Sequence, residues 1–331
     1  MKKTIAFTIC ANNYLAHANV LAKSFKKHHP DIQFYIAIVD EPSNTVNYKS
    51  LASDQIKFVN AINIRGFKDL SYKYKIAELC TVVKPELILQ FFANGFDEVI
   101  YLDPDIEVFN RFNEVFLALS KDPIVFTPHM CSPTPPEIQL IDRNTLRTGI
   151  FNLGFVALKK TDEILKFVKW WDQRVRSFGN IDAKLAHFYD QIWMNAAPVF
   201  LEKLAILRDL GYNVANWNLH ERELIREKNK YYINSTNVPL KFFHFSHFKE
   251  SELPAIAKYN KDFTIENRSD IRNIYLNYAR NLKSEGFNEL NRIPYVYGKT
   301  LENRPFPIMT KRIKMSIFHF KKAIQILLNV N

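Results

Sequence analysis

Two carboxylates separated by a single proline follow an apolar run at residues 99–109, VIYLDPDIEVF. The residues just before Asp103 are apolar or aromatic, which is typical of a fully buried strand. Because Pro104 disfavours helical geometry in the residue before it, Asp103 is expected to be extended, and residues two apart in extended chain point to the same side. Asp103 and Asp105 would then face a common point, where oxygen ligands favour a hard divalent cation such as Mg²⁺ or Mn²⁺. The alternative is a turn capped by these two residues.

The N-terminal region alternates strand and helix patterns, which indicates an α/β fold. Residues 4–10 and 33–39 are apolar runs, and residues 15–28 carry apolar side chains at helical spacing. A strand, a helix and a second strand in succession form a βαβ unit, which implies a parallel sheet. Ligands of such sheets bind at the carboxyl ends of the strands, although polar residues there are also common as ordinary turn residues. The polar candidates in and after these two strands are Thr8, Asn12, Asn13 and Asp40.

Further helix and strand signals follow along the chain. Residues 74–80 and 85–93 are predicted helices, with Pro85 in a first turn and Lys84 between the two helices. The later predicted strands cover 124–126, 148–158 and 240–248, and the later predicted helices cover 162–178, 190–195 and 270–283.

Composition allows one large α/β domain or two small ones in 331 residues, with 47% apolar residues to build a core. The formal net charge of +11 suits nucleic acid, anionic lipid or a negatively charged substrate. The basic residues are scattered, with no basic helix and no RNP-like aromatic strand, so nucleic acid ranks last. Only 8 glycines occur, and neither a G-x-G-x-x-G nor a Walker sequence is present, which disfavours a Gly-rich dinucleotide fold.

The cysteines and the apolar segments indicate where in the cell the protein is expected. Cys10, Cys80 and Cys131 lie far apart without metal-ligand spacing, which favours reduced thiols in the cytosol. The apolar run near the N-terminus is too short for a secretory signal, and no segment reaches the length of a membrane-spanning helix. We therefore expect a cytoplasmic protein, with peripheral attachment to the inner face of the membrane left open.

The order of the motifs resembles that of GT-A-fold, nucleotide-sugar-dependent glycosyltransferases, and of glycosyltransferase family 8 in particular. YLDPDI is similar to the D-x-D metal site of that fold, and TGIFNLGFVAL at 148–158 to the FNAG-type segment, with Leu153 in place of a small residue. DQIWMN at 190–195 resembles a pattern in which an Asp-Gln pair starts a helix. LKFFHFSHF at 240–248 resembles the segment that carries a third metal ligand, with His247 in place of a glycine.

The resemblance implies a Rossmann-like, mostly parallel sheet flanked by helices, with a C-terminal helical extension. It implies a retaining hexosyltransferase that uses a nucleoside-diphosphate sugar, expected to be UDP-linked, and a glycan or lipid-linked acceptor. Mn²⁺ or Mg²⁺ would be held by Asp103, Asp105 and His244, and the catalytic residues would be Asp190 and Gln191. The donor would be bound by Thr8, Asn12, Asn13, Asp40, Lys84, Asn152, Gly154 and Lys249.

Structural roles compete with several of these assignments. Asp190 could be a helix cap, His244 a buried strand histidine and Lys84 a solvated side chain. Two functional alternatives also stay open. One is an inverting transferase with Glu221 as the base on the acceptor side, and the other is an inactive module that binds a sugar or nucleotide.

Three segments complete the prediction. Residues 211–222, GYNVANWNLHER, combine amides and an aromatic ring as sugar recognition requires, although a surface Ω-loop is the alternative. Residues 1–262 are expected to form the transferase domain and residues 263–310 a C-terminal cover. Residues 311–331 contain five Lys or Arg and no acid, with apolar residues at helical spacing. This amphipathic tail helix would lie on an anionic membrane or dock on the protein itself.

Overall fold

A computed structural model describes residues 2–182, 184–228, 230–248 and 263–297, together with Ser316 and His319. The predicted donor ligand Lys249 and nearly all of the predicted tail helix, residues 311–331, lie outside the described residues. Within the described part of the chain, no helix is long and apolar enough to cross a membrane.

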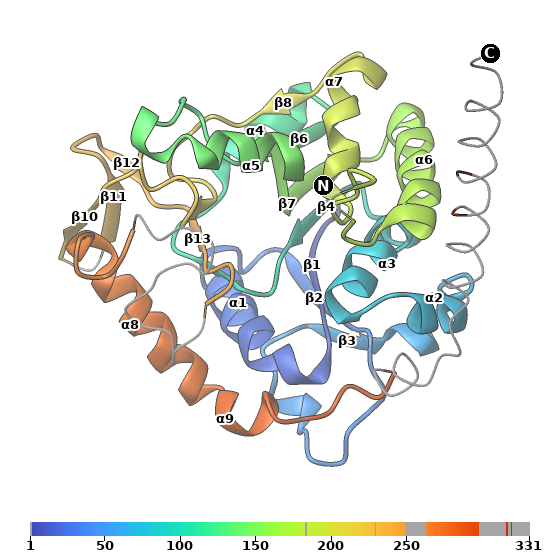
Figure 1. The fold of residues 1–331 in the computed structure, drawn as a ribbon. Helices are drawn as coiled ribbons and strands as arrows, with labels where there is room; N and C mark the ends of the chain where they lie inside the picture. The colour runs from blue at the N-terminus through green and yellow to red at the C-terminus, as the bar shows by residue number, and fades with distance from the viewer. Residues whose placement is uncertain are drawn as a thin grey trace, which may run out of the picture.

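The centre of the molecule is a seven-stranded sheet (Figure 1). Parallel pairing joins the first four strands in spatial order, β7 is antiparallel to both of its neighbours, and β8 is parallel to β6. The spatial order is β3 (Gln55–Phe58), β2 (Gln33–Ile38), β1 (Thr4–Cys10), β4 (Glu98–Leu102), β7 (Phe151–Lys159), β6 (Ile124–Pro128) and β8 (Ala205–Ile206). The predicted fold class, a mostly parallel α/β sheet, is confirmed.

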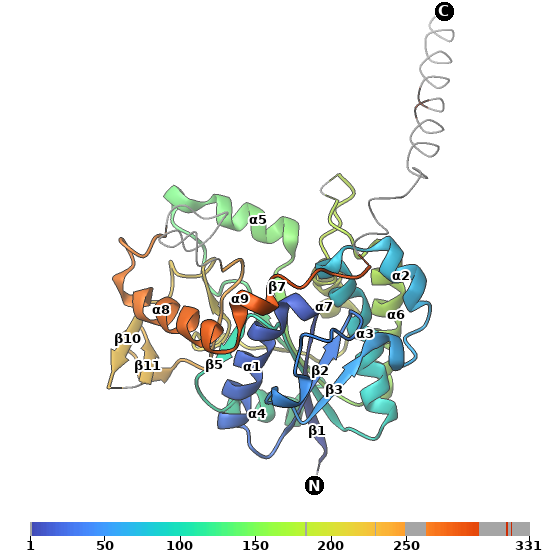
Figure 2. The same ribbon diagram turned by 90° about the horizontal axis from the view of Figure 1, so that it is seen from below.

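Helices cover both faces of this sheet (Figures 1 and 2). The central strands β1 and β4 are continuous apolar runs because both of their faces are buried, as in most parallel sheets. One face packs against α2 (Phe67–Lys73), α3 (Ile76–Ala93) and α6 (Asp162–Phe178). The other face packs against α1 (Leu15–His28) and α4 (Asn113–Lys121).

Two small sheets lie beside the main one. The first contains β5 (Ile106–Val108), β13 (Phe242–His244) and β9 (Val214–Ala215), and it pairs His244 with Ile106. The second contains β10 (Leu224–Glu227), β11 (Lys230–Ile233) and β12 (Val238–Pro239). Because β5 follows the DPD sequence directly, the first small sheet brings a late strand against the end of β4.

The C-terminal described segment packs onto α1 through α8 (Ser269–Ser284) and α9 (Phe287–Leu290). The Nδ1 atom of His17 lies 2.7 Å from the hydroxyl of Tyr278, and Asn19 donates a hydrogen bond to Glu285. Farther on, the backbone N–H of Val296 donates to Asp40 at 3.2 Å. Residues 263–297 therefore share a core with the N-terminal half, and the domain boundary at 262 stays a prediction.

Local patterns predicted α1 and α6 to the residue, but the structure differs from the predicted helices in three other places. The helix expected to break before Pro85 is one helix, α3, because its apolar residues are buried against α6 and the sheet, which outweighs the N–H that proline lacks. The helix α5 (Leu140–Thr148) was not predicted, because it is short and only Ile141 and Thr145 in it are buried. The remaining short helix, α7 (Ala197–Phe200), follows the 3-10 helix η5 (Gln191–Ala196), where an α-helix had been expected.

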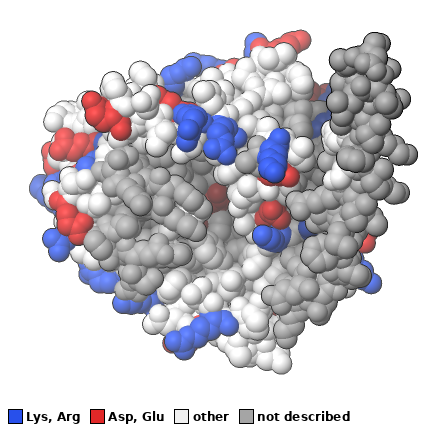
Figure 3. Space-filling view, in the orientation of Figure 1, with Lys and Arg blue, Asp and Glu red and all other residues white. Residues whose placement is uncertain are grey.

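Charged side chains are mixed on the face shown in Figure 3, where Lys and Arg alternate with Asp and Glu around the rim. An acidic side chain is visible in a hollow near the middle of that face. The view shows no continuous basic stripe over the described residues of this face.

Candidate functional site

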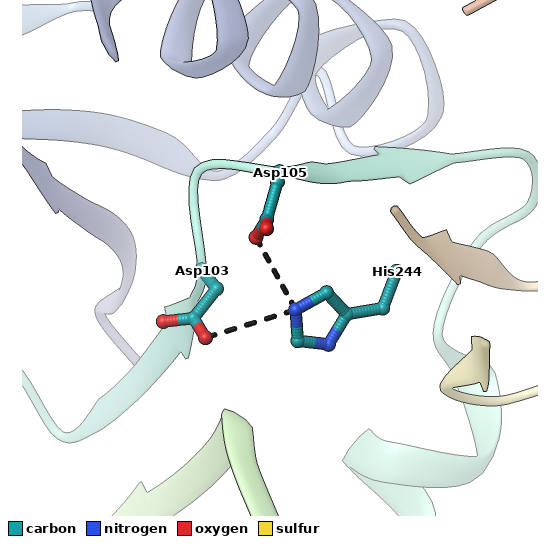
Figure 4. Close-up of side chains that lie close together, drawn as sticks. All are labelled: Asp103, Asp105 and His244. Atoms are coloured by element: carbon teal, nitrogen blue, oxygen red, sulfur yellow. Dashed lines mark ion pairs between the residues drawn. The ribbon is translucent and has the colours of Figure 1, made fainter. Parts of the chain in front are cut away.

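Asp103, Asp105 and His244 converge at the end of β4 (Figure 4). One ligand atom from each lies within 4.8 Å of the other two. The Nε2 atom of His244 is 3.2 Å from Oδ1 of Asp105 and 3.8 Å from Oδ2 of Asp103. These three residues form the only such cluster of His, Cys, Asp and Glu found among the described residues.

A tight turn brings the two carboxylates together. Asp103 still follows the strand, since its N–H donates to the carbonyl of Gly154 at 2.7 Å. The chain then turns through Pro104, and the N–H of Ile106 donates back to the carbonyl of Asp103. The prediction that Asp103 and Asp105 meet through straight extended chain was therefore wrong, although the same two side chains do converge.

The pKa values of the two carboxylates are shifted in opposite directions. Burial raises the pKa of Asp103, and the neighbouring Asp105 raises it further against the opposing effects of Lys84 and His244. Burial also acts to raise the pKa of Asp105, but the charge and hydrogen bond of His244 outweigh it, so this pKa is lowered. For His244, burial acts to lower the pKa, while Asp105 and Asp103 together raise it. A bound cation would replace the imidazolium proton as the positive charge between the carboxylates.

The donor set fits a divalent metal ion of the Mn²⁺ or Mg²⁺ class. Two carboxylate groups supply oxygen ligands, and a neutral imidazole adds a nitrogen that Mn²⁺ accepts. The Nδ1 atom of His244 is 3.3 Å from Oδ1 of Asn213, which leaves Nε2 as the atom that faces the carboxylates. A metal-binding histidine usually donates the N–H of its far ring nitrogen to an acceptor in this way.

Gly154 leaves the room that the imidazole occupies. A Cβ atom at this position would lie 2.4 Å from Cε1 of His244 and 2.8 Å from Oδ1 of Asn152. Both distances are far below van der Waals contact, so any side chain would force His244 or Asn152 to move. The glycine in the NLG sequence is therefore needed for space rather than for an unusual backbone angle.

We expect Gly154→Ala to weaken Mn²⁺ binding by about tenfold or more, because the displaced imidazole no longer points at the carboxylates. Overpacking should also lower the free energy of unfolding by about 1–3 kcal/mol. Titration calorimetry with Mn²⁺ and thermal unfolding measure the two effects. The matched control is Gly95→Ala, which strains a backbone with φ of 86° but meets no atom within 4 Å. A folded Gly154→Ala protein with wild-type Mn²⁺ affinity would contradict the prediction that His244 is a metal ligand.

Lys84 and Asp190 form a buried ion pair next to the cluster. The Nζ atom of Lys84 lies 2.6 Å from Oδ2 of Asp190, with side chains only 1% and 3% exposed. The same Nζ donates to the carbonyl of Leu153 at 3.0 Å and lies 3.9 Å from the ring centroid of Tyr101. Burial raises the pKa of Asp190, and the ammonium of Lys84 opposes this rise. The alternative of a solvated Lys84 is wrong, whereas its contact with a diphosphate stays a prediction.

The residues that follow Asp190 hold the start of β7. Gln191 donates from Nε2 to the carbonyl of Thr148 at 2.9 Å and accepts from the N–H of Leu153 at 3.4 Å. Asn195 accepts from the N–H of Ile150 at 2.9 Å. Asp190 occupies the N-cap position of η5 without a capping hydrogen bond, which leaves the ion pair with Lys84 as its observed role.

Asn152 of β7 connects the cluster to the end of β6. Its Oδ1 accepts from the N–H of Gly154 at 3.1 Å, and its Nδ2 lies 3.1 Å from Nε2 of His129. Burial lowers the pKa of His129 to about 4, so this ring is neutral and can accept the bond. The predicted donor residues Asn152 and Gly154 thus lie directly beside His244, the predicted third metal ligand.

The predicted nucleotide residues at the ends of β1 and β2 also meet. The Asp40 carboxylate accepts N–H groups from Asn12 at 3.5 Å and Glu41 at 3.0 Å, and burial raises its pKa. The side-chain amide of Asn12 donates to the carbonyl of Glu41 and accepts from Tyr48. Asn13 is half-buried, and Thr8 is enclosed within β1 with no hydrogen-bond partner for its hydroxyl among the described residues. Both stay predictions as donor ligands.

The loop at 211–222 bonds its amides internally, and its part in sugar recognition stays a prediction. Asn213, Asn216 and Asn218 all direct their side-chain NH₂ groups to protein oxygens, so these amides stabilise the loop instead of facing outward. Glu221 is engaged as well. Its carboxylate accepts both the N–H of Cys131, at 2.9 and 3.0 Å, and the hydroxyl of Ser132. The structure therefore gives Glu221 an anchoring contact with the loop at 131–132.

Two site residues were missed by reasoning from the sequence. Tyr101 donates from its hydroxyl to Oδ1 of Asp103 at 2.5 Å, and Asn213 contacts His244. Tyr101 lies two residues before Asp103, so strand alternation could have placed it on the same side. No sequence signal joins Asn213 to a strand that begins many residues later.

Comparison with solved structures finds glycosyltransferases. The galactosyltransferase LgtC in complex with donor and acceptor sugar analogs is 14% identical, with a TM-score of 0.47, over 90% of this chain and 100% of that one. The glycosyltransferase GlyE of Streptococcus pneumoniae TIGR4 is also 14% identical, with a TM-score of 0.48, over 89% of this chain and 66% of that one. Likenesses this distant do not by themselves assign an activity.

Sequence comparison adds one relative. The protein named "Uncharacterized protein YfnD" of Bacillus subtilis (strain 168) is 25% identical over 285 residues, which cover 83% of this chain and 88% of that protein. No protein-family model matches the chain.

Proposed function

We propose that this protein is a metal-dependent glycosyltransferase that takes a sugar from a nucleoside-diphosphate donor, expected to be a UDP-sugar. The observation that supports it most is the convergence of Asp103, Asp105 and His244 at the carboxyl end of β4. The interlocked pair Asn12 and Asp40 ends the neighbouring parallel strands β1 and β2. Ligands of open α/β sheets bind at this edge.

The residues around the cluster have distinct proposed roles. Asp103, Asp105 and His244 would hold Mn²⁺ or Mg²⁺, which supplies charge neutralisation to the departing diphosphate. Asn152 and Gly154 would lie along the donor sugar, while Asn12 and Asp40 would orient the nucleoside. The Lys84–Asp190 pair would keep the floor of the site rigid, since neither charge can leave the other without a large desolvation cost.

Retention of the anomeric configuration is part of the proposal, on the strength of Asp190 and Gln191 beside β7. An inverting reaction would need a free carboxylate on the acceptor side. The candidate for that base, Glu221, has a side chain 6% exposed and bonded to Cys131 and Ser132. This bonding favours the retaining proposal.

The acceptor is proposed to be a glycan or a lipid-linked saccharide. The basic composition of residues 311–331, with five Lys or Arg and no acid, suits an anionic membrane surface and motivates the lipid-linked option. Attachment to the inner face of the membrane rests on this composition alone.

The proposal is tested by donor hydrolysis with UDP-, GDP- and dTDP-sugars, with Mn²⁺ and with excess chelator. We expect release of the free sugar from one nucleotide class, and we expect chelation to abolish it because the leaving diphosphate then lacks a counter-charge. The anomer released first, read by NMR, reports retention or inversion. Binding of UDP without turnover of any donor would favour the inactive binding module, and full activity in chelator would refute metal dependence.

A further inference from the structure

Asn213 occupies a buried position directly behind the metal-binding histidine. It is fully buried, and its backbone adopts a left-handed φ of 52° just before β9. Its side-chain oxygen lies 3.3 Å from Nδ1 of His244, and its Nδ2 donates to Oγ1 of Thr127 at 3.2 Å. The backbone carbonyl of Asn213 accepts from Nδ2 of Asn218 at 2.9 Å, which anchors the residue from a third direction.

The contact with Nδ1 decides what the opposite ring nitrogen can do. A neutral imidazole carries one N–H, and the nitrogen without it has the lone pair that binds a metal. When Nδ1–H donates to Asn213, the lone pair of Nε2 faces Asp103 and Asp105. In the other tautomer, Nε2–H would point at the carboxylates and could not bind a cation.

Neighbouring residues restrict the orientation of the His244 ring. Gly154 lies so close that a Cβ there would be 2.8 Å from Nδ1. Trp217 meets the ring edge-on, with centroids 5.2 Å apart and planes at 85°. The apolar and steric contacts thus position the ring, while Asn213 makes the polar contact that distinguishes its two nitrogens.

We propose that Asn213 is a positioning residue that selects the Nδ1–H tautomer of His244 and so directs the Nε2 lone pair at the metal ion. This inference rests on the proposed function, because it assumes that His244 is a metal ligand. It explains why the residue at 213 is neither glycine nor a larger amide. The left-handed backbone favours Gly, Asn or Asp, and of these only Asn and Asp carry an acceptor of the right length.

The backbone preference supplies matched variants. Asn213→Gly keeps the left-handed conformation and removes the acceptor, whereas Asn213→Asp keeps both. We expect Asn213→Gly to weaken Mn²⁺ binding about 10–100-fold, the usual loss when the hydrogen-bond partner of a metal-binding histidine is removed. We expect Asn213→Asp to stay within about threefold of the wild type, because its carboxylate can only accept from Nδ1–H. Titration calorimetry measures both affinities, and thermal unfolding verifies that both variants fold.

A second readout is independent of metal and of turnover. Nitrogen-15 NMR of metal-free protein at alkaline pH, where the ring is neutral, identifies which nitrogen of His244 carries the proton. His244→Gln assigns the signal. Without metal, Asp105 can accept from Nε2–H while Asn213 accepts from Nδ1–H, so the two acceptors compete for the single proton of the neutral ring. We expect a larger share of the Nδ1–H form in the wild type and in Asn213→Asp than in Asn213→Gly. If the wild type bound no Mn²⁺, the proposed function would fail, while the tautomer would still decide the role of Asn213.

Two results would overturn the inference. One is a folded Asn213→Gly protein with the Mn²⁺ affinity of the wild type. The other is the same share of the Nδ1–H tautomer in the metal-free wild type and in metal-free Asn213→Gly.

Discussion

We expect Asp103→Asn and Asp105→Asn each to abolish the proposed Mn²⁺-dependent turnover of the donor and to weaken Mn²⁺ binding by about 100-fold or more, a loss of about 2.7 kcal/mol. Each change replaces a charged oxygen ligand by a neutral amide of almost the same shape. The site then holds one carboxylate and one imidazole, which is too few strong ligands for a hard cation. Calorimetry with Mn²⁺ and the chelator-controlled hydrolysis assay measure both losses.

The two variants should differ in the stability of the metal-free protein. The pKa of Asp103 is raised, mainly by burial, so the fold disfavours its charge, and Asp103→Asn should leave the free energy of unfolding unchanged or higher. The pKa of Asp105 is lowered, because His244 outweighs the effect of burial, so Asp105→Asn should lower this free energy. Urea unfolding in chelator compares them, and the opposite ranking would contradict the electrostatic description.

Glu107→Gln is the matched control for these substitutions. Glu107 lies two residues beyond Asp105 and accepts a hydrogen bond from Asn281 of α8 at 2.8 Å, a bond that glutamine can keep. It contributes no atom to the cluster, so Mn²⁺ affinity should stay at the wild-type value. A loss equal to that of Asp105→Asn would mean that general disturbance of β5 explains both results.

We expect Lys84→Met to lower the free energy of unfolding by about 3–5 kcal/mol, because Asp190 is left as a buried charge without its partner. Asp190→Asn has a similar effect on Lys84, softened by the carbonyl of Leu153 and the ring of Tyr101. The double variant Lys84→Met with Asp190→Asn removes both charges and should regain most of the lost stability. Urea unfolding of the wild type, the two single variants and the double variant forms the required cycle.

Donor hydrolysis by the double variant shows whether the Lys84–Asp190 pair is needed for activity as well as for stability. The double variant should fold but hydrolyse the donor poorly, since it lacks the ion pair that we propose as the rigid floor of the site. The exposed pair Arg111 and Asp31 provides a control, where Arg111→Met should change stability by about 1 kcal/mol or less. If the double variant lost as much free energy of unfolding as the two single variants together, the Lys84 and Asp190 charges would not depend on each other.

Local sequence determined the elements whose signals are complete within one segment. The apolar period of α1 and α6 repeats over several turns, so their bounds could be predicted to the residue. The buried strand β4 and the carboxylates after it were equally readable, because burial on both faces demands a continuous apolar run. Reading such patterns in order along the chain also predicted a late strand at 240–248, of which Phe242–His244 forms β13.

Only the tertiary structure decided which distant groups touch. Lys84 and Asp190 form an ion pair across α3 and η5, and Asn213 reaches His244 across β9 and β13. Neither contact has a periodic signal, since each depends on how separate elements pack. The amides of the loop at 211–222 illustrate the same limit, because their composition suits either sugar binding or internal bonding. The sequence by itself determined which side chains could form the chemistry, while packing of strands and loops around β4 determined which of them face the site and which support it.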